Sequence, residues 1–249
     1  MMQFPPNTTR LCGKKRFSFR CHPGIPCFTE CCRELELVLT PYDVLCLCKE
    51  LQMPSDDFIR QYVVVEQDEN GGFPALYLGM VDDGRASCPF VSESGCRVYR
   101  GRPGACRAYP VGRGVMLDAG NSRHEIHVLV REEHCRGFTE TESHSVDEWF
   151  ENQGLEEYNR INDEVLTLLQ HEKIRSGSFR LSAEQIDNFM LMVYKVDEFR
   201  ELLSTPGSLP ELQLQDEGIA TLLADDISLL LFGVGWLKKS LAAETNDSR

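Results

Sequence analysis

The sequence lacks a hydrophobic run long enough to cross a membrane. Its most apolar segment, Ile227 to Leu237, is short, contains two glycines and is flanked by charged residues. The first ten residues contain two prolines and lack the apolar stretch of a secretory signal. We therefore expect a cytoplasmic protein with no membrane partner, in which cysteine thiols stay reduced.

An excess of positive charge is also missing, because the net charge is −13. Up to Gly137 the 17 Lys and Arg balance 17 Asp and Glu, whereas from Phe138 onward 9 Lys and Arg face 22 Asp and Glu. Binding to duplex nucleic acid depends on clustered basic residues, so we expect no nucleic-acid partner.

Cysteine is absent from the whole second part of the chain, since all eleven cysteines lie before Phe138. The change in charge and the change in cysteine content thus fall at the same place. We predict two domains, a cysteine-cluster metal-binding domain over 1–137 and an acidic helical region over 138–249.

The spacing of apolar residues predicts an α+β fold, in which a small irregular Cys-rich domain with short strands and helices precedes an α-helical C-terminal region. Thr40, Pro41 and Asp43 are typical of a capped helix start. The Asn70-Gly71-Gly72 segment predicts a hairpin turn. The predicted elements are strands over 34–39, 63–65, 74–81 and 124–130 and helices over 41–51 and 55–62. Residues 1–20 and 82–110 are expected to be largely irregular.

After Phe138 the apolar residues follow helical spacing. We predict helices over 145–170, weakened at Gly154, over 182–203 with a capping box from Ser182 and Gln185, and from Gln213 onward.

Eight cysteines lie in irregular segments, most of them near Pro or Gly, and four of these fall within the twelve residues from Cys21 to Cys32. Such segments let several thiolates converge, whereas packed thiols do not need this density of Pro and Gly. We therefore predict metal ligands rather than buried thiols without metal. The candidate ligands are Cys21, Cys27, Cys31, Cys32, Cys88, Cys96, Cys106 and Cys135.

Four thiolates satisfy one tetrahedral Zn²⁺ or hold one 4Fe-4S cluster, so eight suffice for two sites. The adjacent Cys31 and Cys32 favour two neighbouring sites or a multi-iron cluster, because neighbouring side chains diverge. Cys46 and Cys48 lie inside a predicted helix and are interpreted as core residues, and Cys12 has no assigned role. Nitrogen ligands could come from His22, His124, His127 or His134, of which His134 is the best candidate because it precedes Cys135.

Arginines crowd the segment from Arg97 to Leu117, which contains no acidic residue. Two interpretations stay open. The arginines either offset the surplus negative charge of thiolates around a metal or form a solvated basic loop.

The pattern of cysteines and flanking residues resembles the CxxCxxCC cysteine-cluster family, the YkgJ-like proteins described as zinc- or iron-chelating domains. The resemblance covers about Arg20 to Gly137. Its matching segments are Cys21…Cys27…Cys31-Cys32, Thr40-Pro41-Tyr42-Asp43, Cys88-Pro89-Phe90, Gly95-Cys96-Arg97-Val98-Tyr99, Arg102-Pro103…Cys106-Arg107-Ala108-Tyr109-Pro110 and Cys135. The resemblance implies a metal-binding domain with zinc or iron as cofactor. Some relatives are flagellin lysine methylases in which an iron–sulfur cluster is implicated.

Three classes of function remain. The first is a metal-binding protein that holds zinc or iron, with a 4Fe-4S cluster as one form of the iron. The second is an iron–sulfur-dependent enzyme such as a protein lysine N-methylase, for which no glycine-rich S-adenosylmethionine loop is evident. A cluster-based reaction does not need such a loop, so whether the protein is an enzyme stays open. The third is a metal-stabilised interaction module whose acidic helical region binds a protein partner.

Overall fold

The computed structural model describes residues 7–12, 15–118, 120, 122–177, 179–205 and 216–243. The chain divides into two compact units, the first made of Met1–Leu37 and Leu78–Asn159 and the second of Val38–Tyr77 and Arg160–Arg249. Helices and small antiparallel strand pairs occur together, and the C-terminal part is helical, which confirms the predicted α+β class. The boundary at Phe138, inferred from composition, stays a prediction.

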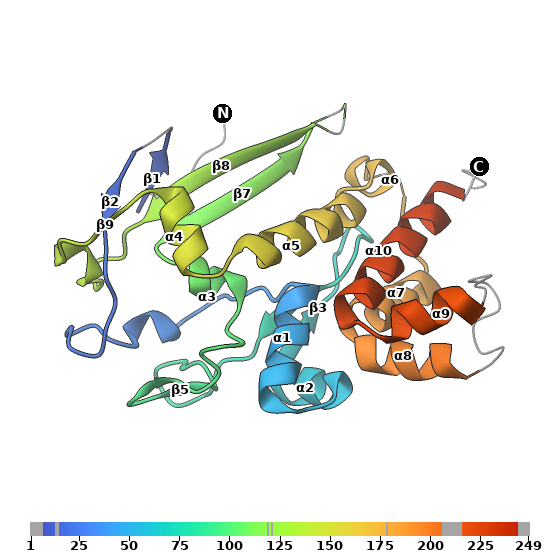
Figure 1. Ribbon diagram of the computed structural model, residues 1–249, viewed down its shortest axis with the longest axis horizontal. Helices are drawn as coiled ribbons and strands as arrows, with labels where there is room; N and C mark the ends of the chain where they lie inside the picture. Colours follow the sequence, from blue (N-terminus) through green and yellow to red (C-terminus); the bar gives the residue numbers. More distant parts are fainter. Residues whose placement is uncertain are drawn as a thin grey trace. The chain divides into compact units, whose positions relative to one another are not determined.

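The first unit contains a three-stranded antiparallel sheet with the strand order β1-β8-β7 (Figure 1). Its strands are β1 (Thr8–Leu11), β7 (Val111–Leu117) and β8 (Arg123–Val130). The strand predicted over 124–130 is therefore confirmed. The irregular structure expected for residues 1–20 is wrong in part, because β1 pairs with β8 more than a hundred residues later, a partner that local sequence does not reveal.

A buried apolar cluster packs on this sheet. Helix α4 (Val146–Asn152) begins at a Ser145–Glu148 capping box and contributes Trp149, whose indole N–H donates to the Ala108 carbonyl at 2.8 Å. Phe19 packs edge-on against Trp149 and Phe138. The cluster consists of Leu11, Phe17, Phe19, Val111, Leu129, Val146 and Trp149, with Tyr109, Cys135, Phe138 and Phe150 packed against it.

The remaining elements of the first unit are short. They are β2 (Phe17–Ser18), which pairs with β9 (Ser143–His144), the 3-10 turns η1 (Glu30–Cys32) and η2 (Gly137–Thr139), the pair β5 (Val91–Ser92) and β6 (Gly95–Cys96), and α3 (Gly104–Ala108). The strand predicted over 34–39 is wrong. Its end forms one antiparallel bridge, Val38 with Tyr77, in which the Leu39 N–H donates to the Leu76 carbonyl at 2.7 Å and the Leu78 N–H donates to the Leu37 carbonyl at 2.9 Å. Arg33, just before the segment, bridges Ser87. A single bridge at Val38 is too short to make the segment a strand.

The second unit begins with two predicted helices that are confirmed, α1 (Pro41–Leu51) and α2 (Ser55–Tyr62). The Thr40 hydroxyl accepts a hydrogen bond from the Asp43 N–H, and the Asp43 carboxylate accepts one from the Thr40 N–H, so the predicted capping box is present. Strands β3 (Val63–Glu66) and β4 (Ala75–Leu78) pair as the predicted hairpin. Within the turn, Gly71 adopts φ +80°, which glycine tolerates without strain.

The helix predicted over 145–170 is two helices, α4 and α5 (Glu156–Leu169), separated at Gly154 with φ +64°. The helix predicted over 182–203 is also divided. Its parts are α7 (Ala183–Phe189), the π-helix η3 (Met190–Tyr194) and α8 (Val196–Ser204). The capping box of Ser182 and Gln185 is confirmed.

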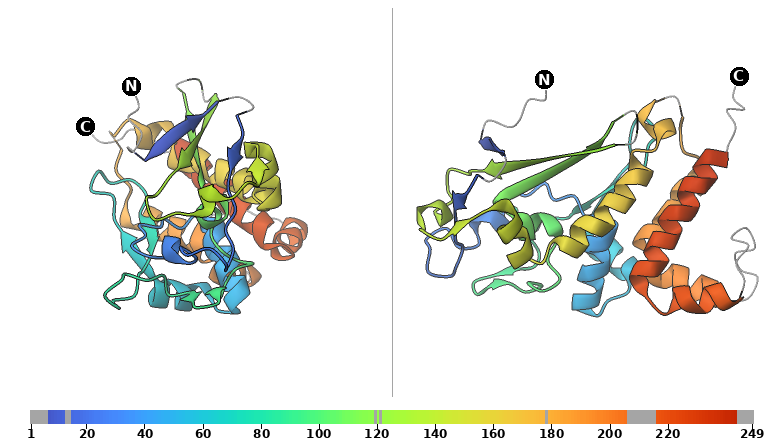
Figure 2. Two further views of the ribbon diagram at one scale, coloured as in Figure 1. Left: turned by 90° about the vertical axis from the view of Figure 1, so that its left-hand side faces the viewer. Right: turned by 45° about the horizontal axis from the view of Figure 1, so that its top comes forward.

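Further helices complete the second unit, α6 (Glu172–Arg175), α9 (Asp216–Leu223) and α10 (Asp226–Ala243), of which the last two follow each other closely (Figure 2). The predicted start near Gln213 lies outside the described residues. A Cβ atom at Gly233 of α10 would lie 2.8 Å from the Met192 carbonyl oxygen, so glycine is needed for this close approach to η3. Among the described helices, none is both long and apolar enough to span a bilayer.

Candidate metal centre

All eleven cysteines lie in the described part of the chain as free thiols. The eight predicted ligands belong to the first unit, whereas Cys46 and Cys48 lie in α1 of the second unit. Burial raises the pKa of the Cys48 thiol to about 12, which suits a packed neutral thiol. The structure thus separates the predicted ligands from these two predicted core thiols, and whether the eight bind metal stays a prediction.

The segment from Cys21 to Cys32 is a series of tight turns. The N–H of Ile25 donates to the His22 carbonyl and the N–H of Phe28 donates to the Ile25 carbonyl, both at 3.1 Å. Pro23 and Pro26 each occupy the second position of one of these turns, where the fixed φ of proline is favoured. The prolines therefore shape the loop that presents the thiols.

A distant segment closes on this loop. The N–H of Arg136 donates to the Cys27 Sγ at 3.1 Å, across 109 residues of sequence. The N–H of Arg20 donates to the Gly137 carbonyl at 3.1 Å, and a Cβ atom on Gly137 would lie 2.5 Å from the Phe19 ring. The absence of a side chain at Gly137 lets this segment lie against Phe19 and Arg20, directly before the loop.

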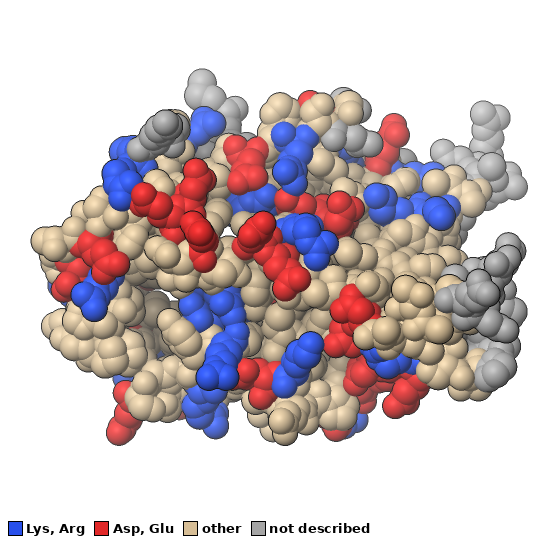
Figure 3. All heavy atoms as spheres, viewed as in Figure 1, with Lys and Arg blue, Asp and Glu red and all other residues tan. Residues whose placement is uncertain are grey.

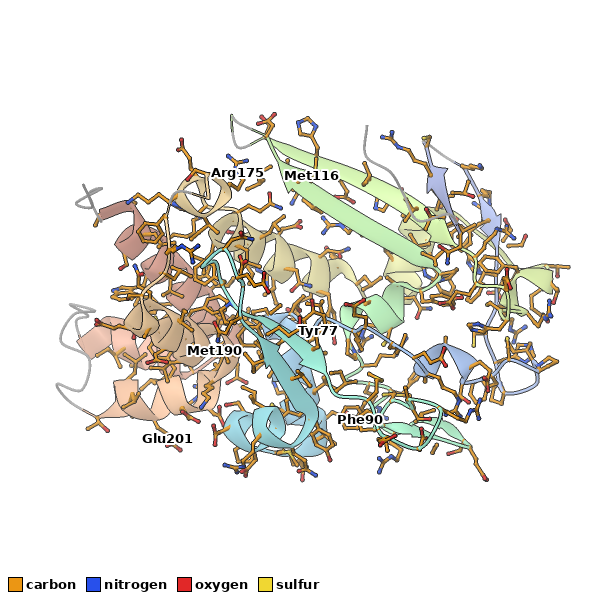
Figure 4. The ribbon with its side chains drawn as sticks, turned by 180° about the vertical axis from the view of Figure 1, so that it is seen from behind. Tyr77, Phe90, Met116, Arg175, Met190 and Glu201 are labelled. Atoms are coloured by element: carbon orange, nitrogen blue, oxygen red, sulfur yellow. The ribbon has the colours of Figure 1, made fainter. Side chains whose placement is uncertain are left out.

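The other cysteines approach from the opposite end of the loop. The N–H of Cys88 donates to the Cys32 carbonyl at 2.8 Å, and the N–H of Phe90 donates to the Cys88 Sγ at 3.5 Å. Phe90 is 2% exposed and lies beside the β5–β6 pair (Figure 4), in which Val91 pairs with Cys96. Cys106 lies in the short helix α3.

The thiols influence one another electrostatically. Burial and the thiolates of Cys31, Cys27 and Cys135 raise the pKa of Cys21 to about 11. A hydrogen bond between the adjacent thiols lowers the pKa of Cys31 and raises that of Cys32, and burial also raises the pKa of Cys32. Burial raises the pKa values of Cys88 and Cys135. Several thiols are therefore protonated without metal, and a binding cation must displace these protons.

Two further polar groups lie beside the thiols, the Glu132 carboxylate and the Tyr109 hydroxyl. The Glu132 carboxylate interacts electrostatically with Cys31, and the Tyr109 hydroxyl lies near Cys135. A carboxylate close to several thiols concentrates negative charge when the thiols ionise, and a cation among these groups would offset that charge. Neither residue was among the predicted ligands, although an acid three positions before Cys135 is a signal that could have identified Glu132.

The four candidate histidines have other partners close at hand. His134 Nε2 lies 3.4 Å from Glu132 Oε2, and His22 Nδ1 accepts a hydrogen bond from the Gly24 N–H. His124 and His127 lie 2.9 and 2.8 Å from carboxylate oxygens of Asp118 and Glu125. These contacts favour a thiol-based site over a site with histidine ligands.

In the segment from Arg97 to Leu117, which contains no acidic residue, arginine side chains donate hydrogen bonds to backbone carbonyls. Arg97 donates to the Pro89 carbonyl. Arg107 donates to the carbonyls of Arg102 at 3.1 Å and Gln153 at 3.0 Å, and also to that of Arg100. Figure 3 shows basic side chains gathered over the region of α3 and β5. Arg102 also interacts electrostatically with Cys106 and Cys96, so it is one cation that offsets thiolate charge.

An open pocket of about 530 Å³ adjoins Cys88. Its lining combines Arg33 with the acids Asp83 and Glu93, and it also includes Ser87, whose hydroxyl accepts a hydrogen bond from Arg33. The pocket therefore connects the region around Cys88 with solvent.

Within the described ranges, no three His, Cys, Asp or Glu side chains are placed so that they could hold a metal ion. The chemistry of the donors nevertheless fits a thiophilic cation, because free thiols, N–H groups directed at sulfur and a nearby carboxylate occur together. Metal binding therefore requires the thiols to move together around the ion.

Comparison with known proteins identifies one family. Residues 20–148, just over half of the 249-residue chain, match the family model described as "CxxCxxCC: Putative zinc- or iron-chelating domain". No curated protein and no solved structure shows a significant match. The matched range includes all eight predicted ligands, and the family description supports a general metal-binding role. The chain belongs to the CxxCxxCC family.

Proposed function

We propose that this protein binds zinc or iron through cysteine thiolates of its first unit. The observation that carries the proposal is the hydrogen bond from the Arg136 N–H to the Cys27 Sγ, which joins two cysteine segments far apart in sequence. The Glu132 carboxylate near Cys31 adds negative charge at the same place, which a bound cation would offset. The proposed ligands are Cys21, Cys27, Cys31, Cys32, Cys88, Cys96, Cys106 and Cys135.

Elemental analysis of the full chain, purified without oxygen, tests this proposal. We expect one or more atoms of zinc or iron per chain. Thiol alkylation should then modify Cys12 faster than the eight proposed ligands, because Cys12 is exposed and outside the set. A folded, metal-free protein that gains no metal on incubation with Zn²⁺ or Fe²⁺ contradicts the proposal.

A second candidate is an iron–sulfur-dependent enzyme, such as a protein lysine N-methylase. The open pocket beside Cys88 favours it, since a substrate could reach the cysteine region from solvent. Brown protein that contains iron and acid-labile sulfide and absorbs visible light supports this candidate. Colourless protein with stoichiometric zinc supports a zinc site instead and excludes the 4Fe-4S form of the proposal.

The proposal also includes a cytoplasmic location and a protein partner that contacts the acidic region over 138–249. Glu151 and Glu156 are exposed acids of this region. Their joint replacement by glutamine should weaken capture of a basic partner and leave metal content unchanged, because neither residue belongs to the proposed ligand set.

A further inference from the structure

Backbone hydrogen bonds and electrostatic interactions link the eight thiols in two sets of four. We propose that they form two adjacent four-thiolate sites for thiophilic divalent cations, divided between Cys31 and Cys32. This inference rests on the proposed metal-binding function and specifies its stoichiometry. Site A consists of Cys21, Cys27, Cys31 and Cys135, and site B consists of Cys32, Cys88, Cys96 and Cys106.

Site A is formed by the turn-rich loop and the segment that ends at Gly137. Cys21 interacts electrostatically with Cys27, Cys31 and Cys135, and Cys135 interacts with Cys27 and Cys31, so the four thiols influence one another directly. The backbone brings them together independently of these interactions. The bond from the Arg136 N–H to the Cys27 Sγ places Cys135 next to the loop.

Site B is formed by the end of the loop and the segment from Cys88 to Cys106. The bond from the Cys88 N–H to the Cys32 carbonyl at 2.8 Å aligns these two residues. Cys96 lies opposite Val91 in the β5–β6 pair, whose tight turn requires Gly95 at φ +114°. Electrostatic interactions join Cys32 with Cys88 and Cys106, and Cys88 with Cys96.

The two groups meet at one place, the 3-10 turn η1 that contains Cys31 and Cys32. Successive side chains of a 3-10 turn point roughly 120° apart, so the adjacent thiols face different neighbours. They still hydrogen-bond to each other. The two cations would therefore lie close together, with the Cys31–Cys32 pair between them.

Charge and coordination number favour two ions over one. A structural zinc ion takes four ligands, so a single ion leaves four thiols without metal. Four thiolates around one divalent cation carry a net charge of about −2, which N–H groups directed at sulfur and nearby cations reduce. The Arg136 N–H serves site A, and the Phe90 N–H and Arg102 serve site B.

Native mass spectrometry of the full chain loaded with Zn²⁺ tests the division. We expect two ions in the unmodified protein. The pair Cys27→Ser with Cys135→Ser should retain one ion, and Cys88→Ser with Cys96→Ser should also retain one. The mixed pair Cys27→Ser with Cys96→Ser should retain none, although it changes the same number of residues. The matched control, Cys12→Ser with Cys48→Ser, should retain both.

A measurement on the unmodified chain avoids variants that fail to fold. With one equivalent of Zn²⁺, alkylation followed by peptide mass spectrometry should show the thiols protected in two groups of four. Cys31 should be protected to the same extent as Cys135, and Cys32 should be protected to the same extent as Cys88.

The outcomes separate this inference from the proposed function. An unmodified chain that binds no metal contradicts both. One ion per chain, or loss of all metal from each within-site pair, overturns the two-site division and leaves metal binding intact. Protection of Cys31 together with Cys88 also overturns the division.

Discussion

The cysteine-bearing segments of the first unit and the helices of the second unit are held together in different ways. In the second unit, Phe58, Met192 and Phe199 have no exposed surface, as expected of an apolar core. Between Cys21 and Cys32 the one buried apolar side chain is Ile25, and successive backbone turns order the chain. We therefore expect that metal ions bound by the thiols stabilise this loop, as apolar packing stabilises the second unit.

Removal of metal should have the largest effect on the difference in stability between the cysteine-bearing segments and the second unit. We expect chelation to open residues 20–37 and 78–137 while the helices of the second unit stay protected, because bound metal stabilises only the part that binds it. Structural zinc sites in small domains contribute roughly 10–16 kcal/mol of apparent free energy. Hydrogen exchange with and without chelator measures the effect. Equal opening of both units on chelation contradicts it.

A serine substitution in each unit should sharpen the contrast. Cys32→Ser is expected to lose the ion of site B and to keep that of site A, because a serine hydroxyl has a far higher pKa than a thiol and is a poor anionic ligand. Cys48→Ser should keep all metal and lose about 1–3 kcal/mol of unfolding free energy if its hydroxyl stays unpaired. Elemental analysis and denaturant unfolding of both variants decide the matter. If Cys48→Ser loses metal and Cys32→Ser keeps it, the assignment of Cys32 as a ligand and Cys48 as a core thiol is wrong.

A smaller effect is expected from Glu132→Gln, which removes the negative charge near Cys31. Groups that support metal ligands typically change metal affinity by about 10–100-fold when mutated, and we expect a loss in this range. Competition with a chromophoric chelator gives the affinity. The neighbouring Glu133 is exposed, so Glu133→Gln is the matched control and should behave like the unmodified chain. Equal affinities for both variants exclude a role for Glu132.

The smallest effect concerns the second unit alone. Thr40→Ala removes the hydroxyl that caps α1 and should cost about 1 kcal/mol of unfolding free energy. Metal content should not change, since Thr40 belongs to neither proposed site. Thr40→Ser retains the hydroxyl and should restore most of the stability in thermal unfolding. A change in metal content with Thr40→Ala contradicts the independence of α1 from the cysteine sites.

The sequence predicted correctly those features of the fold that depend on contacts between residues close together in the chain. The capping box at Thr40 and the glycine turn at Gly71 depend on residues within a few positions, and both are present. Strand β1 and the contact between Arg136 and Cys27 depend on partners about a hundred residues away, which periodicity cannot identify. The π-helix at Met190 was missed because its sequence has ordinary helical spacing.

The candidate site shows the same limit. Flanking Pro and Gly distinguished the eight predicted ligands, all in the first unit, from Cys46 and Cys48, because those residues determine local backbone shape. The grouping of the thiols was not predictable, since it depends on how the segments around Cys88 and Cys135 return to the loop. Glu132 was missed for a different reason, because only cysteine and histidine were considered as candidate ligands although this acid lies three positions before Cys135.

The bonds of Arg107 have a consequence for tolerance to acid and salt. Its guanidinium donates to the carbonyl oxygens of Arg100, Arg102 and Gln153, which carry no ionisable proton. A carboxylate partner would be neutralised at low pH and its attraction screened by salt, whereas a carbonyl acceptor keeps its hydrogen bond under both conditions. Lysine could not replace Arg107, because a single ammonium cannot span three separated acceptors as a planar fork does. We therefore expect the hydrogen bonds of Arg107 to hold the segment around Cys106 in place when the pH falls.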